Sequence, residues 1–147
     1  MVLIFICSNS YSDSIEGEVI KIIDGDTIHI RHNSKTHKIR LAYIDFPEIR
    51  QKYGQSVRMY LSDMIIGKTV RAQIYSIDRY NRLIAEIFFD NKNINLHLIE
   101  TGKCLVYRRY AKGKTNYFIK EKLAKKYQIG LHGDTNFTAP WLWRKSN

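Results

Sequence analysis

Cysteine is scarce in this chain of 147 residues, and several common site patterns are missing. Only Cys7 and Cys104 are present, and Cys7 lies in a segment that we expect to be removed, which leaves one thiol and no disulfide framework. The zinc-binding patterns CxxC and HExxH do not occur. Beyond the N-terminus, no stretch approaches the roughly 18–20 apolar residues of a membrane-spanning helix. These absences argue against a disulfide scaffold, a conventional zinc site and a membrane-spanning chain.

The phosphate-binding loop of nucleotide hydrolases is missing as well. Gly67-Lys68-Thr69 and Gly113-Lys114-Thr115 have the sequence with which such a loop ends. The loop also requires an upstream glycine, and Ser62 and Arg108 stand at those positions instead. Neither segment therefore qualifies.

Acidic residues are few relative to basic ones. The chain has 24 Lys and Arg residues against 14 Asp and Glu residues, a formal net charge of +10. Such an excess attracts polyanions over a long range, which favours a nucleic-acid partner. The alternative is a soluble surface that is basic without binding anything, and charge alone does not decide between the two.

The N-terminus has the features of an incomplete export signal. Residues 2–7 are apolar and residues 8–12 are small or polar, with Ser10 and Ser12 at the small-residue positions before a cleavage site. The basic start of a signal is missing and the apolar run is short, so a frayed strand is the alternative. We expect residues 1–12 to be a signal peptide and the protein to be secreted or periplasmic. Without a signal it would be cytoplasmic.

The spacing of apolar residues predicts the order of secondary structure. Strands are expected at 18–23, 27–31, 38–45, 69–75 and 83–89, and helices at 55–66, 95–101 and 117–127. The last helix would use Ile119, Leu123 and Tyr127 as its apolar face, and the aromatic tail 140–144 would be irregular, with Trp141 and Trp143 pinning it to the barrel. Five strands with a helix after the third indicate an α+β fold, a five-stranded OB-fold β-barrel with about three helices, formed by residues 13–147 as a single domain.

Two aspartates lie at the ends of predicted strands. Asp26 precedes the second strand and Asp45 ends the third, so the barrel can bring their carboxylates together. Two such carboxylates repel unless a cation or a proton lies between them. Oxygen ligands without a softer donor nearby favour calcium or magnesium over zinc. The alternative is that these aspartates only cap turns, which is common for Asp24-Gly25-Asp26-Thr27 taken alone.

Three further charged residues have chemistry that suits phosphate cleavage. Glu48 follows Pro47, which restrains the backbone, and its carboxylate could take a proton from water. Arg40 is expected in the middle of a strand, where its charge needs either a salt bridge or a substrate phosphate. Arg82 ends the turn 78–82. Each taken alone is equally well explained as a structural or solvated residue.

Aromatic and basic side chains alternate in two short segments. Tyr80, Tyr107 and Tyr110 could stack on bases, and neighbouring arginines could hold phosphates. Packing in the core or on the surface explains any single tyrosine equally well. These arginines are Arg79, Arg108 and Arg109.

Together these segments resemble the staphylococcal nuclease (thermonuclease) family over about residues 17–132. The matching segments, in order, are Ile23-Asp24-Gly25-Asp26-Thr27, Arg40-Leu41, Ile44-Asp45-Phe46-Pro47-Glu48, Asp78-Arg79-Tyr80-Asn81-Arg82 and Gly130-Leu131. The tail 140–144 is similar to that of exported bacterial members. The resemblance implies a nuclease that acts on both DNA and RNA and leaves 3′-phosphates. It also implies calcium as the cofactor, and we expect a monomer with no stable membrane association.

The resemblance also implies a role for each matching residue. Asp26 and Asp45 would bind calcium through their side chains and Phe46 through its backbone carbonyl, with Asp24 in the outer shell. The remaining assignments are Glu48 as general base, Arg40 and Arg82 as the phosphate clamp, and Arg79, Tyr80, Tyr107 and Tyr110 on the substrate-binding side.

The chain departs from the family pattern at three places. Phe46 stands where threonine is usual, Asn81 replaces a usual glycine, and the segment after Glu48 is short. These departures bear on rate and substrate preference more than on activity itself. The alternative function is a non-catalytic OB-fold module that only binds nucleic acid, although such members would be expected to lose part of the acid–arginine set. A basic secreted protein without either activity is the third alternative.

Overall fold

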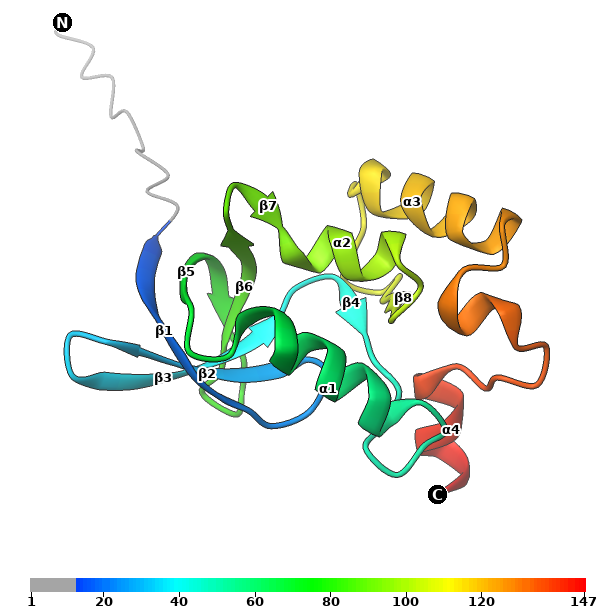
Figure 1. Ribbon diagram of the computed structural model, residues 1–147, viewed down its shortest axis with the longest axis horizontal. Helices are drawn as coiled ribbons and strands as arrows, with labels where there is room; N and C mark the ends of the chain where they lie inside the picture. Colours follow the sequence, from blue (N-terminus) through cyan, green and yellow to red (C-terminus); the bar gives the residue numbers. More distant parts are fainter. Residues whose placement is uncertain (1–12) are drawn as a thin grey trace, which may run out of the picture.

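A five-stranded barrel forms the centre of the computed structural model, which describes residues 13–147 (Figure 1). The barrel strands are β1 (Ser14–Ile22), β2 (Thr27–His32), β3 (Lys35–Leu41), β5 (Thr69–Ile77) and β6 (Leu83–Phe89). Neighbouring strands pair antiparallel in the order β3-β2-β1-β5-β6, and a parallel pairing of β3 with β6 closes the ring. The predicted α+β barrel fold is confirmed. The predicted signal over residues 1–12 lies outside the described residues.

The helical segments are α1 (Gly54–Ile65), α2 (Ile94–Glu100), α3 (Thr115–Lys126), the 3-10 turn η1 (Gly130–Gly133) and α4 (Pro140–Ser146). Helices α1 and α2 pack against the barrel, α3 packs on α2, and α4 lies at the C-terminal end of the chain (Figure 1). The helix predicted at 55–66 corresponds to α1, which buries Val57, Leu61 and Ile65. No helix among residues 13–147 is long and apolar enough to cross a bilayer.

The predicted third strand, 38–45, is interrupted. β3 ends at Leu41, and Tyr43 has a left-handed backbone conformation with φ of 70°. The chain then forms β4 (Ile44–Asp45), which pairs with β8 (Leu105–Val106) in a separate two-stranded sheet. The other short strand, β7 (Lys92–Asn93), extends the barrel sheet beside β6. The break redirects the segment that leads to Asp45 and Glu48 away from the barrel wall.

The predicted apolar face of α3 is wrong. Ile119, Leu123 and Tyr127 are 54%, 44% and 64% exposed. The helix instead buries Glu121 together with Tyr117 and Ala124. The Glu121 carboxylate accepts a hydrogen bond from the Val106 backbone N–H at 2.9 Å and pairs with Arg108 at 2.8 Å. The buried carboxylate therefore has hydrogen-bond partners and satisfies a backbone N–H of β8. The periodicity of apolar residues cannot predict such a buried acid.

The tail was predicted to be irregular, and this is also wrong. Residues 140–146 form α4, with Pro140 at its first turn, where a missing N–H costs nothing. Trp141 stacks on Tyr107 with ring centroids 6.4 Å apart and planes 2° apart. This contact agrees with the predicted pinning role of Trp141.

A buried asparagine joins the interrupted strand to the barrel. Asn95, in α2, is fully buried, and its amide nitrogen donates to the carbonyls of Ala42 and Ala85 at 3.1 Å each. Its amide oxygen accepts from the Ile87 N–H at 3.1 Å. One side chain therefore satisfies backbone groups of β6 and of the turn that follows β3.

We expect Asn95→Ala to lower the free energy of unfolding by about 2–4 kcal/mol, because it leaves buried backbone groups without partners. Urea denaturation followed by circular dichroism would measure the change. Asn136→Ala is the matched control, because Asn136 is exposed and should alter stability by no more than about 0.5 kcal/mol. Equal stabilities of the two variants would contradict the role of Asn95.

Candidate active site

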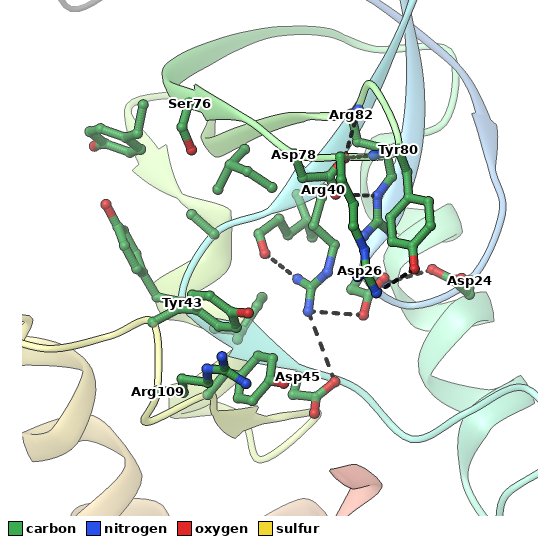
Figure 2. A pocket seen from close by; sticks show the side chains of 18 of the residues that line it. Asp24, Asp26, Arg40, Tyr43, Asp45, Ser76, Asp78, Tyr80, Arg82 and Arg109 are labelled. Atoms are coloured by element: carbon green, nitrogen blue, oxygen red, sulfur yellow. Dashed lines mark hydrogen bonds and ion pairs between the residues drawn. The ribbon is translucent and has the colours of Figure 1, made fainter. Parts of the chain in front are cut away.

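A cleft of about 960 Å³ opens at one end of the barrel, between the β1–β2 turn, the 78–82 turn and the segment 107–110 (Figure 2). Nine of the ten predicted site residues line it: Asp26, Arg40, Asp45, Glu48, Arg79, Tyr80, Arg82, Tyr107 and Tyr110. This volume is near the upper end of the usual range for small-ligand pockets, so the cleft can hold a segment of a polymer.

The tenth predicted residue, Phe46, lies elsewhere. Its side chain is only 2% exposed and belongs to the hydrophobic core. A Cβ on Gly25 would lie 2.3 Å from the Phe46 ring, so the ring packs directly against the turn that carries Asp24 and Asp26. The bulk that distinguishes Phe46 from threonine is therefore taken up by the core, and it requires glycine at position 25.

Asp24 and Asp26 come from the turn between β1 and β2 but have different environments. The Asp24 carboxylate accepts hydrogen bonds from the N–H groups of Asp26 at 3.1 Å and Thr27 at 2.8 Å. Burial, and then the negative charge of Asp26, raise the pKa of Asp24 to about 6. Asp24 thus stabilises the turn through hydrogen bonds, as the capping alternative predicted. The Asp26 carboxylate instead pairs with Arg40.

Arg40 lies between the two aspartates that were predicted to meet (Figure 2). Its Nη2 is 3.2 Å from Asp26 and 3.9 Å from Asp45, and its Nη1 donates to the Leu41 carbonyl. One guanidinium therefore links the end of β3, the start of β2 and β4. The strand ends bring the two carboxylates near each other, as the sequence predicted, and the cation that contacts both is Arg40, in the salt bridge that was one of its two predicted roles.

Asp45 is the most deeply buried charge of the cleft, with a side chain that is 1% exposed. Burial raises its pKa, and the nearby positive charges of Arg144 and Arg40 offset this only in part. A further cation beside Asp45 would therefore stabilise the ionised form of its carboxylate.

Arg82 is held by the turn on which it lies. Its Nε donates to the Asp78 carboxylate at 2.8 Å and its Nη1 to the Thr27 hydroxyl at 3.2 Å. Burial raises the pKa of Asp78, but the hydrogen bonds from Arg82 outweigh burial and leave that pKa below its usual value. The turn also needs Asn81 in the left-handed region, at φ of 60°, and Asn adopts this region readily.

Tyrosines and arginines form the outer rim of the cleft. Tyr80 and Tyr110 are 60% and 59% exposed, and Tyr110 meets Tyr107 edge to face at 4.8 Å. Arg79 lies over the Tyr80 ring at 4.8 Å and donates to its hydroxyl at 2.7 Å. Exposed aromatic faces beside guanidinium groups suit stacked bases and phosphates.

Sequence reasoning missed several residues that line the cleft, among them Tyr43, Tyr75 and Ser76. Another is Arg144 of α4, which hydrogen-bonds directly to two predicted acids. Its two terminal nitrogens donate to both oxygens of Asp45, at 3.1 and 2.7 Å, and one of them also donates to Glu48 at 2.7 Å. These hydrogen bonds raise the pKa of Arg144. Nearly one hundred residues separate Arg144 from its partners, and no periodic pattern connects them. The only signal was a basic residue at the end of an aromatic tail.

The residues of this cleft fit a hard divalent cation. Among residues 13–147, no three Asp, Glu, His or Cys side chains converge into a ready-made metal site. The predicted donor set is smaller, namely the carboxylates of Asp26 and Asp45 and the carbonyl of Phe46. Oxygen donors of this kind, beside a buried carboxylate with a raised pKa, suit calcium or magnesium rather than zinc.

Comparison with known proteins relates this chain to nucleases. Residues 38–134 match the family described as "Staphylococcal nuclease homologue". An "Uncharacterized endonuclease" of Escherichia coli O157:H7 is 32% identical over 88% of this chain and 85% of its own length. A "Micrococcal nuclease" of Shigella flexneri is 33% identical over 89% and 81%, and an "Uncharacterized endonuclease" of Haemophilus influenzae is 37% identical over 86% and 71%. The chain belongs to the staphylococcal nuclease family.

Proposed function

We propose that this protein is a calcium-dependent nuclease that hydrolyses phosphodiester bonds in DNA and RNA. Family membership and the named relatives support a nucleic-acid hydrolase. The observation that carries the finer proposal is the convergence of two aspartates, a glutamate and two arginines in one cleft. Acids alone would suit a metal and arginines alone a phosphate, but phosphodiester hydrolysis needs both.

Asp26 and Asp45, with the carbonyl of Phe46, would hold the metal. A bound calcium ion would supply positive charge to a phosphate oxygen and favour deprotonation of a nearby water. Asp45 suits this role because burial raises the pKa of its carboxylate, and Arg144 and Arg40 lower that pKa only in part. Asp24 would support the site by fixing the turn before Asp26.

Glu48 would act as the general base. It takes a proton from water, the water oxygen bonds to phosphorus, and the bond from phosphorus to the 5′ oxygen breaks. The released 5′ oxygen takes up a proton, so the products carry a 3′-phosphate and a 5′-hydroxyl. Glu48 follows Asp45 by three residues and lines the same cleft, which supports this assignment.

Arg40 and Arg82 would stabilise the charge that develops on the phosphate oxygens. A guanidinium presents several N–H donors in a plane and can hold two oxygens at once. Arg40 lies near the end of β3 and Arg82 directly before β6, which pairs with β3, so both guanidinium groups line the same cleft (Figure 2). Arg79, Tyr80, Tyr107 and Tyr110 would bind the adjoining nucleotides. Export from the cytoplasm and a monomeric state remain predictions from the sequence.

We expect Arg40→Ala and Arg82→Ala each to lower kcat about 10²–10³-fold, with a much smaller change in KM, because each removes donors that act mainly in the transition state. Steady-state cleavage of single-stranded DNA would measure both constants. Arg31→Ala is the control, because Arg31 forms an exposed ion pair with Glu18 on the barrel surface. Wild-type turnover in either variant would refute the assignment.

We expect Glu48→Gln to lower kcat about 10²–10⁴-fold at saturating calcium, since the amide keeps the size of the side chain but cannot take a proton. Glu100→Gln, which breaks only a surface pair with Lys120, should leave the rate unchanged. The base would have to be another group if Glu48→Gln cleaved DNA at the wild-type rate.

We expect excess chelator to abolish cleavage and added calcium to restore it, because the metal lowers the barrier to attack by water. Gel analysis of single-stranded DNA with and without calcium tests this, and the Arg82→Ala protein prepared in parallel reports any contaminating nuclease. Cleavage that persists undiminished in chelator would rule out the metal role. Binding without cleavage in calcium would instead support the non-catalytic nucleic-acid-binding module.

A further inference from the structure

The guanidinium of Arg144 occupies the two carboxylates that the proposed chemistry requires to be available. It donates to both oxygens of Asp45 and to Oε1 of Glu48, at distances from 2.7 to 3.1 Å. Asp45 is the proposed metal ligand and Glu48 the proposed base. Arg144 takes one acceptor position on each oxygen of Asp45 and one on Oε1 of Glu48, so a metal at Asp45 or a water at Glu48 has to share these carboxylates with the guanidinium.

Charge opposes the simultaneous presence of a metal and Arg144 at Asp45. A divalent cation bound to Asp45 would lie within a few ångströms of the Arg144 guanidinium and be repelled by it, and the Asp45 side chain that they would share is only 1% exposed. Arg40 is the other cation near Asp45, at 3.9 Å, and its shorter contact is with Asp26 at 3.2 Å. Arg144 is therefore the group with which an incoming metal competes directly for Asp45.

We propose that Arg144 is an internal counter-ion of the metal site: it binds Asp45 and Glu48 in the metal-free protein, and a divalent cation displaces it and so frees Glu48 and α4. This inference rests on the proposed metal role of Asp45. It makes the C-terminal helix an autoinhibitory element whose release depends on the metal.

The contacts around α4 are suited to such an exchange. The segment before the helix is firmly anchored, since Asp134 accepts hydrogen bonds from Lys52 and the Tyr53 hydroxyl at 2.7 Å each. Gln51 donates to the Thr138 carbonyl at 2.5 Å. Beyond Pro140, the contacts of α4 with the rest of the described chain include the Trp141–Tyr107 stack and the Arg144 hydrogen bonds. Loss of the latter can release the helix while residues 134–140 stay in place.

The two tryptophans of the chain give a direct readout, because Trp141 and Trp143 both lie in α4. In the full-length wild-type protein, we expect calcium to change tryptophan emission along the same saturation curve that isothermal titration calorimetry measures for calcium binding. No substrate and no turnover are needed for either measurement.

Arg144→Gln should already have the emission of the calcium-bound protein before calcium is added, and it should bind calcium about tenfold more tightly, because no internal cation has to be displaced. Arg144→Lys should lie between this variant and wild type, since an ammonium keeps the charge but not the paired hydrogen bonds. Lys145→Gln is the matched control. It removes the same charge from the neighbouring position of α4, and no ion pair of Lys145 is present in residues 13–147. Its affinity and emission should equal those of wild type.

Two results would overturn the proposal. If wild type binds calcium without a change in tryptophan emission, and Arg144→Gln binds with equal or lower affinity, Arg144 stays on Asp45 in the metal-bound state and is a structural strap. If neither protein binds calcium or magnesium by calorimetry, the proposed metal role itself fails and this inference fails with it. Circular dichroism of each variant would establish that all of them are folded.

Discussion

The Asp45 carboxylate is almost completely removed from water, and a charge in that position needs cationic partners. Arg40 comes to it from β3, where it also pairs with Asp26. Arg144 comes from the opposite end of the chain and brings α4 against the cleft. Asp45 thus links two segments far apart in the sequence, the end of the barrel wall and the C-terminal helix, through arginines that neutralise one buried carboxylate.

Asp45 is buried because the barrel wall is interrupted just before it. The left-handed Tyr43 ends β3 and sends the chain into a pairing with β8, so that Ile44 and Asp45 are both buried. Asn95 holds this departure by bonding the carbonyls of Ala42 and Ala85. The same region therefore has two roles. The pairing of β3 with β6 closes the barrel, and the break after β3 places the Asp45 carboxylate in the cleft.

The spacing of apolar residues within short segments predicted several strands and helices correctly. The apolar segment 83–89 after the 78–82 turn gave the bounds of β6 correctly, and the predicted helix 55–66 lies within one residue of α1 at each end. The same reasoning failed for α3, whose buried Glu121 is stabilised by a backbone N–H and an arginine from another element. It failed for the tail as well, because the contacts that hold α4 come from residues far away in sequence. A pattern within a segment carries no information about such partners.

The sequence by itself determined the barrel, the order of its strands and the family, and it singled out nine residues that line one cleft. It could do so because strand patterns and the short segments that match the family are local, and because barrel closure leaves few ways to arrange five strands. Only the tertiary structure decided that Phe46 packs into the core against Gly25 and that Arg144 lies on Asp45 and Glu48. Both are contacts between distant segments, fixed by how the whole chain excludes water and pairs its charges.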